Sequence, residues 1–140
     1  MTRERDHWLG LRHLALSVTD LDAHLRFYTE LLGFTVEWRP DPDNVYLTTG
    51  QDNLALHRVE HHPGTGALDH FGFVVTRPED VELWYQRVVQ YGAKVTAAPR
   101  KHRDGATSFY FEAPEGLVIQ IIHHPPLEKL PAGPDPKAGG

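Results

Sequence analysis

The sequence of 140 residues contains no cysteine, which excludes disulfide bonds, thiolate metal sites and a cysteine nucleophile. It also contains no apolar run near the roughly 18 residues that a membrane-spanning helix needs, so no membrane association is expected. The first ten residues, MTRERDHWLG, are charged and lack the apolar core of a secretion signal. These absences together predict a cytoplasmic protein.

Positively charged residues are also fewer than negatively charged ones. The chain has 14 lysines and arginines against 19 aspartates and glutamates, a net charge of −5, with no block of like charge. A polyanion such as nucleic acid is therefore not an expected partner. The residue in unusual supply is histidine, which occurs ten times. Neutral imidazole is the commonest metal ligand in proteins and exchanges protons near neutral pH, so the placement of these histidines bears on function.

Two segments of the chain share one pattern. Residues 11–19 and 68–76 are both alternating apolar stretches typical of β-strands, and they place His13 and His70 at equivalent points. The alignment of the later segments makes His57 equivalent to Gln120. The pattern indicates an internal repeat.

Each of these strands is followed by an amphipathic helix and then by three short strands. The helices are expected to end at Gly33 and Gly92, where glycine favours the left-handed backbone, and the second to begin with a capping box of Thr76 and Glu79. The repeated order predicts an α+β fold of two tandem βαβββ modules. The expected strands after the helices are 34–39, 45–48, 53–59, 94–97, 107–112 and 117–123. The expected boundaries are an extension at 1–10, a first module at 11–59, a linker at 60–67, a second module at 68–124 and a disordered proline-rich tail at 125–140, with both modules in one domain.

Side chains alternate across a strand, so His13 shares a face with the small residues Ala15 and Ser17, and His70 shares a face with Gly72. A histidine beside small residues at both repeat positions favours a metal site over a packed core. If the modules pair about a pseudo-twofold axis, both imidazoles and Gln120 converge in one concavity. A purely structural role is the expectation for His7, His24, His61, His62, His123 and His124.

One further motif narrows the chemistry. The segment from His102 through Phe109, Tyr110, Ala113-Pro114-Glu115-Gly116 to Gln120 is similar to the pattern of type I extradiol ring-cleavage dioxygenases, which end it with a metal-binding glutamate. Residues from about 10 to 123 resemble the vicinal oxygen chelate superfamily, which also contains glyoxalase I, bleomycin-resistance proteins and fosfomycin-resistance enzymes. The resemblance implies an open, curved mixed sheet with helices on its outer face, a divalent metal in its concavity, a small-molecule substrate and a homodimer.

The resemblance also implies roles for single residues. His13, His70 and Gln120 match the metal ligands, and His57 matches the acid/base histidine or else a fourth ligand. His102 and Tyr110 match a hydrogen-bonding pair beside the metal, which we count with His57 as candidate catalytic residues. The candidate substrate-binding residues are Ser17, on the face of His13, and Arg103, in a basic loop.

Three functions follow from this set. The first is a dioxygenase that uses Fe(II) or Mn(II) on a catecholic or similar vicinal-oxygen substrate. The second is a glyoxalase-like lyase or isomerase with Ni(II) or Zn(II), although this chemistry relies on a carboxylate ligand as its base. The third is a metal-free binding protein of the bleomycin-resistance type, which the net negative charge and the tryptophans suit. Gln120 brings no charge to the ion, so a bound metal would be held more weakly and would favour an anionic substrate.

Overall fold

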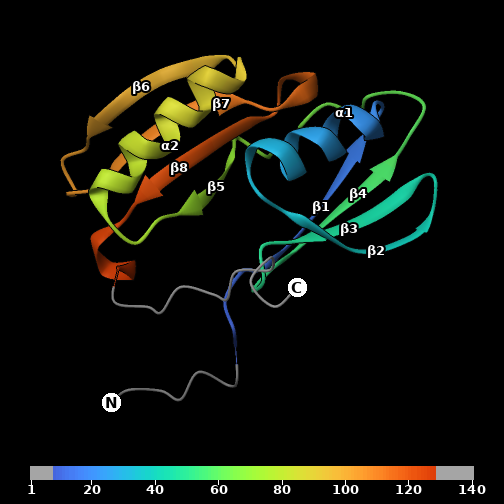
Figure 1. Ribbon diagram of the computed structural model, residues 1–140, viewed down its shortest axis with the longest axis horizontal. Coiled ribbons are helices and arrows are strands. Elements are labelled where there is room, and N and C mark those ends of the chain that lie inside the picture. The colour runs from blue at the N-terminus through green and yellow to red at the C-terminus, as the bar shows by residue number, and fades with distance from the viewer. Residues whose placement is uncertain (1–7, 129–140) are drawn as a thin grey trace.

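The computed structural model describes residues 8–128, which form two βαβββ modules (Figure 1). The prediction of an α+β fold with this repeated order is confirmed. The first module consists of β1 (His13–Val18), α1 (Leu21–Arg26) with the π-helical turn η1 (Phe27–Leu31), β2 (Thr35–Asp41), β3 (Asn44–Thr48) and β4 (Asn53–Arg58). The second consists of β5 (Phe71–Val74), α2 (Pro78–Tyr91), β6 (Val95–Lys101), β7 (Thr107–Glu112), the 3-10 turn η2 (Pro114–Gly116) and β8 (Val118–His123), followed by a 3-10 turn η3 (Pro125–Leu127).

Each module forms its own four-stranded sheet, in the orders β1-β4-β3-β2 and β5-β8-β7-β6. The strands β1 and β5 pair in parallel with β4 and β8, and all other neighbours are antiparallel. The single open sheet of the sequence-based expectation is thus divided into two open sheets. The reason is that β1 and β5 each lie at the edge of a sheet and do not hydrogen-bond to one another.

The glycines predicted after the C-terminal ends of the helices have the expected backbone conformation, but the cap predicted at the N-terminal end of α2 is not formed. Gly33 and Gly92 both have left-handed backbones, with φ of 78° and 92°. The capping box of Thr76 and Glu79 is wrong, because Pro78 takes the first helical position and makes Arg77 the N-cap, without a side-chain cap. Thr76 instead donates to Asp80 at 3.3 Å.

Neither helix is long and apolar enough to cross a membrane within residues 8–128. The predicted disordered tail begins with the 3-10 turn η3. The rest of that tail, residues 129–140, and residues 1–7 lie outside the described part of the chain.

One apolar core joins the two modules. Strand alternation sends Leu16 and Val18 of β1 and Phe109 and Phe111 of β7 into the same cluster, which the helices cover. Phe27 of η1 lies 6.2 Å from Phe111 between ring centroids, so aromatic contacts cross from one module to the other. The modules therefore meet through their helix-covered faces.

A polar network joins the modules beside this core. Glu115, in η2 of the second module, accepts hydrogen bonds from the Thr19 amide at 3.0 Å, from the Thr19 hydroxyl and from His24 Nε2 at 2.7 Å. Thr19 and His24 belong to the β1–α1 region of the first module, and His24 is fully buried. Glu115 has a φ of 64°, a backbone conformation that costs a side-chain-bearing residue free energy. The hydrogen bonds made in this position offset that cost.

The pKa values of Glu115 and His24 are both lowered, which favours a charged carboxylate and a neutral imidazole. Desolvation favours the neutral carboxyl of Glu115, but the hydrogen bonds from Thr19 and His24 outweigh it and lower the Glu115 pKa to about 2. Burial lowers the pKa of His24, against the attraction of Glu115. His24 is thus neutral at pH 7 and donates through Nε2, which leaves its buried Nδ1 without a partner.

We predict that Glu115→Gln destabilises the protein by about 1–3 kcal/mol at pH 7, because it replaces a charge-assisted acceptor with an amide. A carboxyl with a lowered folded-state pKa stabilises above its unfolded pKa, so the difference between wild type and variant should shrink as pH falls from about 5 towards 2. Urea unfolding at pH 7 and pH 3 measures both values. An equal difference at the two pH values would show that Glu115 is not the titrating group.

Candidate functional site

The face of the first sheet that carries His13 is open. His13, Ala15 and Ser17 of β1 are exposed, whereas Leu16 and Val18 on the opposite face are buried. This alternation is the one predicted from the sequence. The sheet register places His13 opposite Asn53, and Ser17 opposite His57.

Both histidines of this face are held at Nδ1. His13 Nδ1 lies 2.7 Å from Asn53 Oδ1, and His57 Nδ1 lies 2.6 Å from Asn44 Oδ1. We call His13 and His57 the first half-site. Because Nδ1 is occupied in each ring, Nε2 is the nitrogen that each ring offers to a ligand.

Aromatic rings stand beside His57. The edge of Tyr46 meets the imidazole at a centroid distance of 5.9 Å, and the Trp38 indole stacks on Tyr46 at 5.3 Å with 15° between the planes. Trp38 is 60% exposed. The row of Trp38 and Tyr46 therefore offers a flat apolar surface next to the first half-site.

The second sheet brings two of the predicted ligands together. His70 Nε2 lies 3.2 Å from Gln120 Oε1, and the Tyr110 ring meets the His70 ring edge-on at 5.1 Å. Tyr110 is directly opposite Gln120 in the register of β7 and β8. We call His70 and Gln120 the second half-site.

Hydrogen-bond chemistry defines what the second half-site can bind. His70 Nδ1 lies 2.6 Å from the Asp69 carboxylate, which can only accept, so a neutral His70 carries its proton on Nδ1. With the amide oriented as in the structure, the Nε2 lone pair of His70 then faces an oxygen lone pair of Gln120. A nitrogen and an oxygen atom that both offer lone pairs on an open face are suited to coordinate a cation.

The remaining predicted residues lie around the second half-site or away from it. His102 Nε2 lies 2.7 Å from Ser108 Oγ, two residues before Tyr110 on β7, and makes no hydrogen bond to Tyr110. Arg103 is exposed in the turn between β6 and β7. The second module therefore holds Tyr110, but not His102, against a predicted ligand.

The three histidines of the two half-sites do not form one cluster among the described residues. Among residues 8–128, no three histidine, aspartate or glutamate side chains are close enough to hold one ion, so His13, His57 and His70 do not converge. β1 and β5 lie at the edges of separate sheets and are not hydrogen-bonded to one another, so the two half-sites do not share a sheet.

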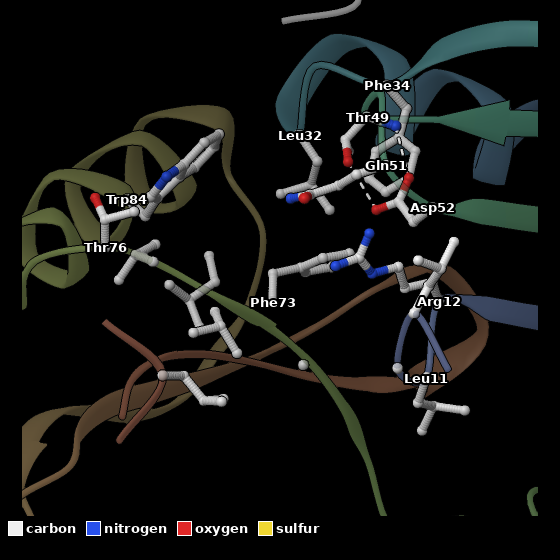
Figure 2. Close-up of a pocket in the computed structure, with 17 residues that line it drawn as sticks. Leu11, Arg12, Leu32, Phe34, Thr49, Gln51, Asp52, Phe73, Thr76 and Trp84 are labelled. Atoms are coloured by element: carbon white, nitrogen blue, oxygen red, sulfur yellow. Dashed lines mark hydrogen bonds between the residues drawn. The ribbon is translucent and has the colours of Figure 1, made fainter. Parts of the chain in front are cut away.

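A cavity of about 490 Å³ lies between the modules, but its lining contains none of the predicted site residues. Arg12 and Phe73 reach into it, and Trp84 of α2 forms part of the opposite wall (Figure 2). Asp52, near the Arg12 guanidinium in this view, is held by the Thr49 amide and hydroxyl at 2.7 Å.

Three residues that hold the half-site histidines at Nδ1 were missed from the sequence: Asn44, Asn53 and Asp69. Asp69 directly precedes His70, which was a readable signal. Asn44 and Asn53 become visible only through register, because each stands opposite its histidine on a neighbouring strand.

Comparison with known proteins gives a family match over most of the chain. Residues 10–121 match the family model described as Glyoxalase/Bleomycin resistance protein/Dioxygenase superfamily. The chain is 32% identical to a 3-methylcatechol 2,3-dioxygenase of Pseudomonas putida over 79% of this chain and 40% of that protein. It is 36% identical to the glutathione transferase FosA of Serratia marcescens over 80% of this chain and 79% of that protein. It is 30% identical to an iron-dependent extradiol dioxygenase of Rhodococcus jostii over 80% of this chain and 42% of that protein.

Solved structures share the fold. An integron cassette protein from the mobile metagenome of a Halifax Harbour sewage outfall superimposes with a TM-score of 0.73 at 24% identity, covering 83% of this chain and 99% of that one. A lactoylglutathione lyase from Agrobacterium tumefaciens gives a TM-score of 0.69 at 21% identity, covering 82% and 93%. The chain spans about two fifths of the length of the two dioxygenases but nearly all of these two structures.

The packing around Gln120 gives a test of the second half-site. A Cβ added at Gly72 would lie 3.0 Å from the Gln120 carbonyl oxygen and 3.4 Å from its Cβ. We predict that Gly72→Ala destabilises the protein by about 1–2 kcal/mol and shifts the NMR signals of the Gln120 side-chain amide and the His70 ring. Val74→Ala, at a half-exposed residue of the same strand face, should leave those signals in place. Unchanged signals in Gly72→Ala would contradict this geometry.

Proposed function

This chain belongs to the Glyoxalase/Bleomycin resistance protein/Dioxygenase superfamily, and from that premise we propose that it is a metal-dependent enzyme acting on a small molecule with two neighbouring oxygen atoms, most similar in chemistry to an extradiol dioxygenase. The observation on which this rests is the approach of His70 Nε2 to Gln120 Oε1 at 3.2 Å. Relatives named as a catechol dioxygenase and an iron-dependent extradiol dioxygenase support the choice.

The donor set fits a divalent ion. His13 and His70 offer Nε2, because oxygen atoms of Asn53 and Asp69 occupy Nδ1. Gln120 adds an amide oxygen. When bound, Fe(II) or Mn(II) would supply a Lewis-acidic and redox-active centre for two vicinal oxygens of the substrate. A set of neutral ligands leaves the ion its full charge, so an anionic substrate is favoured.

We propose that a second copy of the chain completes this site. The first half-site of one copy would face the second half-site of the other, and this arrangement fits the finding that no three histidine, aspartate or glutamate side chains among residues 8–128 lie close enough to hold one ion. Among the strands of residues 8–128, none pairs with the outer edge of β1 or of β5. Edge strands with open hydrogen-bonding groups are surfaces on which another chain can pack. The proposed unit is therefore a homodimer with two sites.

The residues near the ion would then have separate tasks. His57 would accept a proton from a substrate hydroxyl, and Ser17, opposite it in register, would contact the substrate. Tyr110, against His70, would donate a hydrogen bond to a developing oxyanion. Arg103 would bind an anionic substituent from its exposed turn, and His102 would orient the β7 strand through Ser108.

The flat surface of Trp38 and Tyr46 favours an aromatic substrate, and it also favours one competing function. A metal-free binding protein of the bleomycin-resistance type would use the same stacked rings to hold a planar ligand. Such a protein would bind aromatic ligands with quenching of Trp38 fluorescence, equally with and without metal. A glyoxalase-like lyase would instead isomerise a thiohemiacetal in the presence of metal without consuming oxygen.

We predict one Fe(II) or Mn(II) per chain after anaerobic loading, measured by elemental analysis, and metal-dependent oxygen uptake with catechols. His70→Ala should lose the metal, because it removes a ligand of the second half-site. His124→Ala, a histidine outside both half-sites, is the matched control and should keep it. No metal above background after loading would exclude the proposed enzyme.

Mixing two inactive variants tests the shared site. His13→Ala and His70→Ala homodimers should each lack metal sites, yet refolding them together should restore about one quarter of the wild-type sites. The reason is that half of the dimers formed at random are mixed, and each mixed dimer regains one intact site of two. A site built within one chain would give no restoration.

Gln120→Glu should tighten metal binding at least about tenfold, because it adds a negative charge beside the ion. Isothermal titration with Mn(II) measures the change. An unchanged affinity would remove Gln120 from the set of ligands.

A further inference from the structure

The β2–β3 hairpin places an acid, an amide and an imidazole in line. Asn44 Nδ2 donates to both carboxylate oxygens of Asp41, at 3.0 and 3.1 Å. Asn44 Oδ1 lies 2.6 Å from His57 Nδ1. Register explains the alignment, because Asn44 is opposite Asp41 on one side and opposite His57 on the other.

The acid determines which end of the amide faces the ring. A carboxylate only accepts hydrogen bonds, so the NH2 group of Asn44 must face Asp41, and its oxygen must face His57. That oxygen also only accepts, so the proton of a neutral His57 must lie on Nδ1. The lone pair is consequently on Nε2, which has no hydrogen-bond partner among residues 8–128.

Asp41 is itself held in place. The Asp43 amide donates to Asp41 Oδ1 at 2.8 Å, so one of the two carboxylate oxygens that Asn44 contacts is fixed by the backbone of the same turn. The Asp43 side chain is used elsewhere, in an ion pair with Arg58 at 2.7 Å. The two acids of this hairpin turn thus have different partners, and it is the Asp41 carboxylate that accepts from the Asn44 side chain.

His13 and His70 also have an oxygen atom within hydrogen-bond distance of Nδ1. Asn53 accepts from His13 Nδ1 at 2.7 Å and donates to Glu37 at the longer distance of 3.5 Å. His70 meets the carboxylate of Asp69 directly. An oxygen lies at Nδ1 in all three rings, an arrangement that leaves Nε2 of each neutral imidazole with the lone pair.

We propose that Asp41 and Asn44 are positioning residues that fix the Nδ1-protonated tautomer of His57 and so keep its Nε2 ready to accept a proton or bind a ligand on the open face of the first sheet. The use of that lone pair in catalysis rests on the proposed function. The tautomer itself is a property of the metal-free chain and stands apart from any activity. An intervening amide transmits the orientation of the acid without placing a charge against the imidazole.

The test is the tautomer of His57, which long-range ¹H–¹⁵N NMR reads from the ring nitrogen shifts of metal-free, ¹⁵N-labelled protein at a pH of about 8.5, above the usual titration range of imidazole. Wild type should show Nδ1–H and a lone pair on Nε2. Asn44→Leu removes the acceptor at nearly constant volume and should move the proton towards Nε2, the site that neutral histidine favours in water. Asp41→Asn frees the Asn44 amide to turn and should give a mixture of both forms.

Asp43→Asn is the matched control, because it removes the neighbouring acid of the same turn without touching Asn44, and it should keep the wild-type tautomer. Backbone amide spectra establish that each variant is folded, and Asp41→Asn provides the answer if Asn44→Leu does not fold. Wild-type His57 protonated on Nε2, or a folded Asp41→Asn variant with an unchanged tautomer, would overturn the proposal. If the enzyme function holds, Asn44→Leu should also lose about 10–100-fold in kcat/KM. A chain without enzymatic activity but with the expected tautomers would refute only the proposed function.

Discussion

The alternation of side chains across β1, β4, β5 and β8 is the constraint on which the rest of this structure depends. One face of each sheet is apolar and closes on the helices, which joins both modules into one core. The other face must then present whatever lies at the intervening positions, and in both modules these positions hold histidines. Burial of Leu16 and Ile119 therefore requires that His13 and Gln120 face outward.

Gln120 decides how this scaffold differs from a site with a carboxylate ligand. An amide can coordinate a divalent ion but contributes no negative charge, so an ion at the proposed site would be held less tightly and would depend on the substrate for charge balance. The second module contains a nearby acid in Asp69, yet its carboxylate is used at His70 Nδ1. The negative charge of Asp69 therefore lies next to Nδ1 of His70, on the side of the ring away from Gln120.

Much of the fold was readable from the sequence because its signals are local. Alternating apolar residues and the glycines at 33 and 92 identified the strands and the helix ends, and the repeat identified the modules. The capping box failed because the rigid ring of Pro78 moved the start of α2 by one residue. His70 and Gln120 were expected to lie together with His13 as metal ligands, and the structure places His70 Nε2 3.2 Å from Gln120 Oε1. Their role as ligands stays a prediction.

The remaining features depend on contacts between distant residues, which periodicity does not encode. His24 was assigned a structural role but not its partner Glu115, which is 91 residues away. The orientation of one module against the other follows from many apolar contacts at once, so the sequence did not reveal that His13, His57 and His70 form no single cluster among the described residues. Asn44 and Asp41 read as ordinary turn residues until the hairpin register placed them in line with His57.

The most direct measurement is a crystal structure of the protein loaded with Mn(II). This account predicts an ion within about 2.0–2.3 Å of Nε2 of His13 from one copy and of Nε2 of His70 and Oε1 of Gln120 from its partner. An ion held through Nδ1 of these rings, or by three residues of a single copy, would contradict it.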